Sequence, residues 1–243
     1  MNKSQLTNFI TKYTLGGEIK STKWTSNGDS LSTRFISGDK SVVGSVVLSK
    51  FNHLSPCELG VYNTGQLSSL LSVLGDDVEV SLSQSGDKFI SMEFEDTNRK
   101  TKSKYMLSDL SVIPTPPALK NLPDTFELGI KVDPYFVNTF ISGKGALSEA
   151  ETFTILTEGG ETKIVIGYAS IASNRVTIPV ETETNGLSNP VTFNANLFKE
   201  VLVANKECKS AVLEVSNEGL AKVDFKVDDY DSTYYVVAMQ DVD

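Results

Sequence analysis

The sequence predicts a short helix followed by a β-hairpin four times along the chain, and this repetition limits the folds that the chain can adopt. In residues 63–74 the apolar side chains recur at i, i+3, i+4 and i+7, which predicts a helix with one buried face. Alternating apolar residues then predict two strands at 78–82 and 89–94, joined by a turn at Gly86. Residues 194–227 repeat this order, and Asn194 is the expected helix cap.

The copies form two sets that are related by one offset. Helical spacing at residues 6–13 and 134–142 predicts two more helices, and each is followed by a strand, a glycine turn and a second strand. Phe9 and Phe140, Gly28 and Gly159, and Asn63 and Asn194 are each 131 positions apart (194 − 63 = 131). Three agreements in the same order indicate a duplicated architecture, which is a feature to test before other assignments.

The duplication predicts an α+β fold of two similar domains, each with two helix-plus-antiparallel-strand repeats. We expect domains at residues 1–110 and 125–243, joined by a connector at 111–124. The connector holds four of the eight prolines, a composition typical of stiff, extended linkers. Further strands are predicted at the following ranges: 42–49, 57–62, 102–108, 174–182, 190–194 and 232–240.

The residues that usually carry chemistry are scarce. His53 is the single histidine, Cys57 and Cys208 lie far apart outside any C-x-x-C pair, and no phosphate-binding or nucleophile motif occurs. We therefore expect no catalytic residue, no metal and no cofactor. No apolar run approaches the roughly 18 residues that span a bilayer, and the N-terminus lacks a signal peptide, so we expect a cytoplasmic protein that does not engage membranes.

The net charge and the local distribution of basic residues point to different partners. A net charge of −9 argues against nucleic acid, because DNA-binding proteins usually carry a basic surface. Net charge is a sum, however, whereas a binding surface is local. Basic residues gather on or beside the predicted helices and in the segment 98–104, and each of them could equally be an ordinary solvated residue. They are Lys3, Lys12, Lys144, Lys199 and Lys206, with Arg99, Lys100 and Lys102.

Taken together, this order of elements resembles the sliding clamps, the ring-shaped processivity factors of DNA replication, and is most similar to those of tailed phages. The resemblance rests on four segments, and it spans nearly the whole chain. They are GVYNTGQLSSLLSVLGDDVEVSLSQSGDKFISMEFED (60–96), TRFISGD (33–39), the proline-rich connector and TYYVVAMQDVD (233–243).

The resemblance implies a ring of three identical chains, with the helices lining a central hole for duplex DNA and the sheets outside. The basic residues above would face the DNA. It also implies head-to-tail pairing of two strands between neighbouring subunits, which would protect sheet edges. The residues implied in this interface are Lys104, Tyr105, Met106 and Leu107 on one side and Arg175, Val176, Thr177 and Ile178 on the other.

Clamp partners dock a peptide in an apolar pocket beneath the connector. The matching positions here are Ile36, Val112, Ile113, Leu119, Val237, Ala238 and Met239. The implied partners are a replicative DNA polymerase and a clamp-loader ATPase, and transcription factors are a further class that the resemblance allows. If the chain is phage-encoded, it would act in the host cytoplasm. A non-catalytic structural or virion β-rich protein, or an enzyme without recognisable motifs, stays open as an alternative.

Overall fold

The structure, a computed structural model, describes residues 1–118, 122–123, 125–169, 174–182 and 186–239. It divides into two compact units, and neither is a single stretch of sequence. Unit 1 comprises Met1–Gly38, Gly44–Pro117 and Asp228–Ser232; unit 2 comprises Asp39–Val43, Ala118–Val227 and Thr233–Asp243. None of the helices within the described ranges has the length and apolar character needed to cross a membrane.

The first half of the chain contains two α-helices and seven strands. In order they are α1 (Lys3–Thr14), β1 (Thr22–Ser26), β2 (Leu31–Ile36), β3 (Val42–Leu48), β4 (Cys57–Val61), α2 (Thr64–Ser72), β5 (Val78–Ser85), β6 (Lys88–Asp96) and β7 (Lys102–Met106). Two 3₁₀ turns, η1 (Leu15–Gly17) and η2 (Leu110–Val112), follow α1 and β7. The strands run in the orders β4-β1-β2-β3 and β5-β6-β7.

The second half repeats this plan. Its elements are β8 (Leu128–Val132), α3 (Pro134–Ala146), β9 (Thr152–Glu158), β10 (Glu161–Ile166), β11 (Val176–Pro179), β12 (Val191–Asn194), α4 (Ala195–Ala204), β13 (Ala211–Val215), β14 (Leu220–Val227) and β15 (Tyr230–Val237). The orders β12-β9-β10-β11 and β13-β14-β15 match those of the first half strand for strand. This agreement confirms the α+β fold and the duplication predicted from the 131-residue offset.

Strand β8 was not predicted from the sequence. It pairs with β13 from Leu128 to Val132. The equivalent position in unit 1 is taken by the chain start, because the Met1 amino group donates to the carbonyl of Val78 at 2.8 Å and Asn2 bridges to Asp77. Both units therefore close this sheet edge, one with a full strand and the other with two residues.

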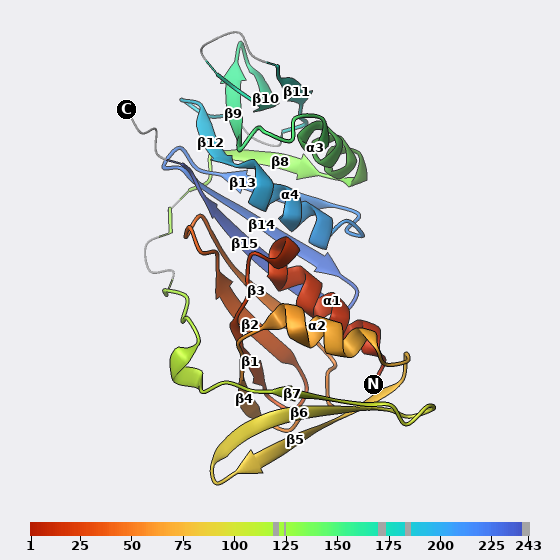
Figure 1. The fold of residues 1–243 in the computed structure, drawn as a ribbon. Coiled ribbons are helices and arrows are strands. Elements are labelled where there is room, and N and C mark those ends of the chain that lie inside the picture. Colours follow the sequence, from red (N-terminus) through yellow and green to blue (C-terminus); the bar gives the residue numbers. More distant parts are fainter. Residues whose placement is uncertain (119–121, 124, 170–173, 183–185, 240–243) are drawn as a thin grey trace. The chain divides into compact units, whose positions relative to one another are not determined.

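The helices of each unit lie side by side, as Figure 1 shows for α1 with α2 and for α3 with α4. Aromatic residues fill the core beneath them. Phe9 meets Trp24 edge to face with the ring centroids 5.5 Å apart, and Phe140 meets Phe198 in the same way at 5.0 Å. Such pairs contribute about 0.5–1.5 kcal/mol beyond area burial. The repeated Phe9 and Phe140 are thus repeated core positions.

The helix starts are fixed by side-chain caps. Asn63 accepts a hydrogen bond from the Gln66 amide at 3.0 Å, and Asn194 accepts one from the Leu197 amide at 3.0 Å. Asp133 caps α3 in the same way, with Pro134 at the first helical position. These caps set the residue at which each helix begins, and the apolar pattern along the helix sets which face is buried.

Candidate nucleic-acid interface

The exposed faces of α1 and α2 are polar and almost uncharged. On α1 the exposed side chains are Ser4, Thr7, Asn8 and Thr11, and on α2 they include Gln66, Ser69 and Ser72. Their opposite faces bury apolar residues such as Phe9 and Leu67. Unit 1 therefore presents hydroxyl and amide groups on both helices, although a basic residue, Lys12, was predicted on the exposed face of α1.

Four of these hydroxyls are turned back onto their own helices. Thr11 donates to the carbonyl of Thr7 at 2.9 Å, and Thr7 donates to that of Lys3 at 3.2 Å. In α2, Ser69 and Ser72 donate to the carbonyls of Gly65 and Ser69. A hydroxyl has one proton and two lone pairs, so these groups offer acceptors outward. A phosphate also offers only acceptors, so it would reach them through bridging water.

The helices of unit 2 expose more varied side chains. On α3 Tyr135 is 76% exposed, next to the exposed polar residues Asn138 and Ser142. On α4 the Lys199 ammonium lies 2.9 Å from a Glu200 carboxylate oxygen, so its charge is locally balanced. Lys206, just after α4, is exposed and has no ion pair among the described residues.

Two of the predicted DNA-facing lysines are buried, so the prediction is corrected for them. Lys12 is 3% exposed, and its ammonium lies 5.3 Å from the centre of the Tyr230 ring. Lys144 is 4% exposed and donates to the carbonyls of Leu147 and Ser148, just beyond its helix. Each lies in the last turn of its helix, where a cation offsets the negative end of the helix dipole. Both lysines stabilise helix ends.

The densest basic segment is neutralised by the neighbouring strand. Antiparallel pairing of β6 and β7 sets Lys102 opposite Glu95 and Lys104 opposite Glu93, with ion pairs of 2.9 and 2.7 Å. Lys100 lies 3.8 Å from Glu95. Hydrogen bonds from Lys102 and Lys104 lower the pKa of Glu95 and Glu93 respectively, which keeps both acids charged.

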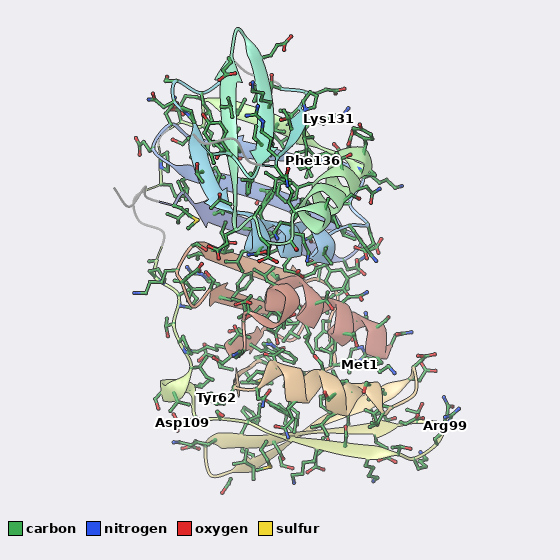
Figure 2. All side chains as sticks on the ribbon, turned by 45° about the horizontal axis from the view of Figure 1, so that its top comes forward. Met1, Tyr62, Arg99, Asp109, Lys131 and Phe136 are labelled. Carbon is green, nitrogen blue, oxygen red and sulfur yellow. The ribbon has the colours of Figure 1, made fainter. Side chains whose placement is uncertain are left out.

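These carboxylates were missed by the sequence analysis, although the alternation of β6 could have revealed them. Lys102 is the first residue of strand β7, and Lys100 lies just before it. Both are ion-paired with Glu95, so neither adds net positive charge to a helix face. Arg99 differs: it projects from the β6–β7 turn, at the opposite end of this sheet from Asp109 (Figure 2). Lys3 has no ion pair among the described residues and donates to the carbonyl of Leu74 at 2.5 Å.

The two predicted interface strands are both sheet edges. β7 is the last strand of the sheet β5-β6-β7, and β11 is the last strand of β11-β10-β9-β12. On β7 Tyr105 is buried, whereas Lys104 and Met106 are exposed and Leu107, just after the strand, is half-buried. On the other side Ile178 is buried, Val176 is half-buried, and Arg175 and Thr177 are exposed. Each edge thus offers backbone groups that a further strand could pair.

The residues predicted for the peptide pocket belong partly to unit 1 and partly to unit 2. In unit 1 Ile36 is half-buried and Val112 is 57% exposed. Ile113 is only 4% exposed, and a Cβ built on Gly60 would lie 3.3 Å from its Cγ1 atom. Ile113 therefore anchors the connector to β4, and its side chain is not available to a peptide. Leu119 lies outside the described residues.

In unit 2 the segment Val237 to Met239 is held by backbone hydrogen bonds on three sides. The amides of Val237, Ala238 and Met239 donate to the carbonyls of Ser41, Gly219 and Thr192 respectively, at 2.7 to 2.8 Å. The side chains of Val237 and Met239 stay 42% and 44% exposed. A fixed backbone with exposed apolar side chains is preorganised for contact with a partner.

Within the described ranges, no group of three or more His, Cys, Asp or Glu residues could hold a metal ion. His53 is exposed and lies edge to face against Phe51, and partial burial lowers the pKa of its imidazole. Neither observation gives it a partner for acid–base chemistry.

Comparison with known proteins is informative for structure and finds no match in sequence. No protein-family model matches the chain, and no curated protein matches it in sequence. Among solved structures, it is similar to the proliferating cellular nuclear antigen of Entamoeba histolytica, with a TM-score of 0.75 and 14% identity. The match covers 99% of this chain and 97% of that one. At this identity the likeness establishes the fold alone, and the chain therefore has the sliding-clamp fold.

Proposed function

We propose that this protein is a homotrimeric sliding clamp, of the tailed-phage type, which encircles duplex DNA and tethers the replicative polymerase. The observation that carries the proposal is the full-length match to the clamp fold. The duplicated helix-and-sheet plan supports it, because two units per chain and three chains would give a ring of six similar units. The protein would catalyse nothing, and it would act in the cytoplasm, that of the host if phage-encoded.

The exposed helix faces suit a wall that slides along DNA. Hydroxyls that donate to their own helix contact phosphates through water and fix no register. Lys3, Arg99, Lys199 and Lys206 remain as the proposed positive charges of this wall. Because few of these cations are unpaired, the attraction between the wall and DNA would be weak. A closed ring needs no stronger attraction, because the protein can leave the DNA only when the ring opens.

Ring closure would occur by pairing of β7 from one subunit with β11 of the next. Both are edge strands, and heterologous pairing that closes under rotation gives a ring. Exposed Met106 and half-buried Leu107 would become buried, which would remove a hydrophobic edge from water.

Polymerase and clamp loader would bind through apolar residues that are exposed or half-buried. We retain Ile36, Val112, Val237, Ala238 and Met239 for this role. A clamp-loader ATPase would open the ring and close it around primed DNA.

Two measurements test the proposal. Native mass spectrometry should give an oligomer of three times 26.4 kDa; a monomer or dimer would favour the structural-protein alternative. With loader and ATP present, the protein should lengthen polymerase products on primed circular DNA and fail to do so on linear DNA with free ends. Equal stimulation on both templates would contradict encirclement, and no stimulation of the cognate polymerase would end the clamp hypothesis.

A further inference from the structure

Strand β5 is an edge of the sheet β5-β6-β7, on the opposite side from β7 (Figure 1). The chain start covers only the beginning of this edge. The Met1 amino group donates to the carbonyl of Val78 at 2.8 Å, and the Val78 amide donates to the Met1 carbonyl at 2.9 Å. Beyond Val78, no described residue outside β6 bonds to the backbone of β5. Most of this eight-residue strand therefore has a free edge.

The free backbone groups can be assigned from the alternation of a β-strand. Successive residues of an antiparallel strand turn their N–H and C=O groups to opposite sides. Because Val78 uses both groups toward the chain start, Val80 and Leu82 turn theirs the same way, and the residues between them turn theirs toward β6. The two residues thus offer two amides and two carbonyls that a further strand could pair.

The side chains of Val80 and Leu82 are also incompletely covered. Val80 lies opposite Phe94, and Leu82 lies opposite Met92, on one face of the sheet. Phe94 and Met92 are 1% and 0% exposed, whereas Val80 and Leu82 are only half-buried. Neighbours across strands contact each other on a shared face, so apolar side chains of an added strand would cover both residues.

Unit 2 contains the strand that completes such an edge. At the offset of 131, Leu82 corresponds to Leu213 of β13 (213 − 82 = 131). Leu213 is fully buried, and β8 places Ile130 opposite it and Val132 two residues further on, both also buried. Lys131 lies between them and turns to the other face. An apolar, basic, apolar run therefore matches the edge that is free in unit 1.

The other face of the free edge is acidic. The register sets Glu79 directly opposite Glu95, and like charges at such a position destabilise a sheet. Glu95 is compensated by Lys102 at 2.9 Å. Glu79 is exposed, and it has no ion pair within the ranges that the structure describes. A basic side chain on an added strand would give Glu79 the partner of opposite charge that β6 does not provide.

We propose that the edge of β5 binds an extended segment of a partner protein, which adds as an antiparallel strand and alternates apolar with basic residues. In strand addition, backbone hydrogen bonds supply affinity and alternate side chains supply specificity. The apolar residues cover Val80 and Leu82, and a basic residue pairs with Glu79. The antiparallel direction is that of both the chain start and β8 on their equivalent edges.

This inference does not need the ring, because every residue that it uses on the protein lies in unit 1. The ring closure proposed above uses the other edge of the same sheet, β7, so it leaves β5 free.

The first experiment measures fluorescence anisotropy of a labelled octapeptide of alternating Lys and Val on the full-length protein. We expect saturable binding. The same peptide with Pro in place of its two central Val residues is the control, because it keeps the charge and cannot donate the backbone hydrogen bonds. Glu79→Gln should weaken binding about threefold, since it removes an exposed ion pair. Glu161→Gln, which removes an exposed acid from β10 of unit 2, should leave the affinity unchanged.

A proline on the edge tests the strand geometry directly. Val80→Pro removes an N–H that faces away from β6 and places a ring on the free edge, a position that sheets tolerate. It should weaken peptide binding at least about tenfold while the melting temperature stays close to that of the parent protein. If this variant does not fold, Glu79→Gln and amide hydrogen exchange decide the question.

Amide hydrogen exchange of the parent protein locates the bound strand. The peptide should slow exchange at Val80 and Leu82 and leave Glu79 and Ser81, whose amides already face β6, unchanged. Protection at β7 instead, equal binding of the proline peptide, or full affinity in a folded Val80→Pro variant would overturn the proposal. So would a change in oligomer mass on Val80→Pro in the absence of peptide binding, because the edge would then pair with a second copy of this chain.

Discussion

Lys206→Gln should reduce the slope of DNA affinity against salt concentration. Lys206 is exposed just after α4, without an ion pair among the described residues. Each cation that neutralises a phosphate of duplex DNA contributes about 0.9 to the slope of log K against log salt. One Lys206 in each of three subunits therefore contributes a slope of about 3 in magnitude.

The expected size is large enough to measure. Between about 50 and 200 mM salt, a slope of about 2.7 changes the affinity by roughly 40-fold, and the variant should lose this part of the dependence. Lys199→Gln should change the slope much less, because Glu200 already lies 2.9 Å from the Lys199 ammonium. The assay is anisotropy of a labelled linear duplex of about 30 base pairs, onto which a ring can thread, titrated at several salt concentrations.

The control is Lys163→Gln, which removes the same charge from strand β10, where the lysine is paired with Glu158 at 2.6 Å. It should leave the slope unchanged. The reasoning is refuted if Lys206→Gln alters the slope by less than about 1, or if Lys163→Gln alters it as much. Either result would place the DNA on a surface other than the exposed helix face of α4.

Three further outcomes follow from contacts in unit 1. Tyr13→Phe should lower the free energy of unfolding by about 1–3 kcal/mol, because the buried Trp24 indole donates to the Tyr13 hydroxyl at 3.2 Å and would lose its acceptor. Unfolding can be monitored by the fluorescence of the single tryptophan. A change below about 0.5 kcal/mol would contradict this prediction. Val112→Asp should weaken polymerase binding in a pull-down without lowering the melting temperature. Ile113→Asp should lower the melting temperature, because it buries a charge. If Val112→Asp lowered the melting temperature and Ile113→Asp did not, the peptide-binding residues would have to be sought elsewhere. The Lys88 ammonium, 2.6 Å away, and the Ser111 amide hold the pKa of Asp109 well below its usual range. The stabilisation that the charged Asp109 gives the fold is therefore present above about pH 4 and is lost as the pH falls further. Asp109→Asn should reduce the acid dependence of the melting temperature, and an unchanged pH profile would show that the Lys88–Asp109 ion pair is not populated.

The order of elements was readable from the sequence because it depends on local patterns. Helical spacing of apolar residues, capping side chains and glycine turns act within a few residues, and the offset of 131 then related the two halves. Strand β8 was missed because it is short and follows the proline-rich connector, although Leu128, Ile130 and Val132 alternate as strand residues do. The clamp fold itself was predicted from the resemblance of the whole plan, and the structural match agrees with it.

The electrostatics of the candidate site depended on the tertiary structure. Counting lysines treats every cation as available, but Lys12 and Lys144 are buried at helix ends, and Lys102 and Lys104 are paired across strands with acids 7 and 11 residues away in sequence. Lys23 and Arg34 likewise lie opposite each other only through the register of β1 and β2. Sequence patterns determine which face of an element is buried, because that choice repeats along the element. Only the pairing of distant segments decides which charges meet, and so which of them are left for a partner.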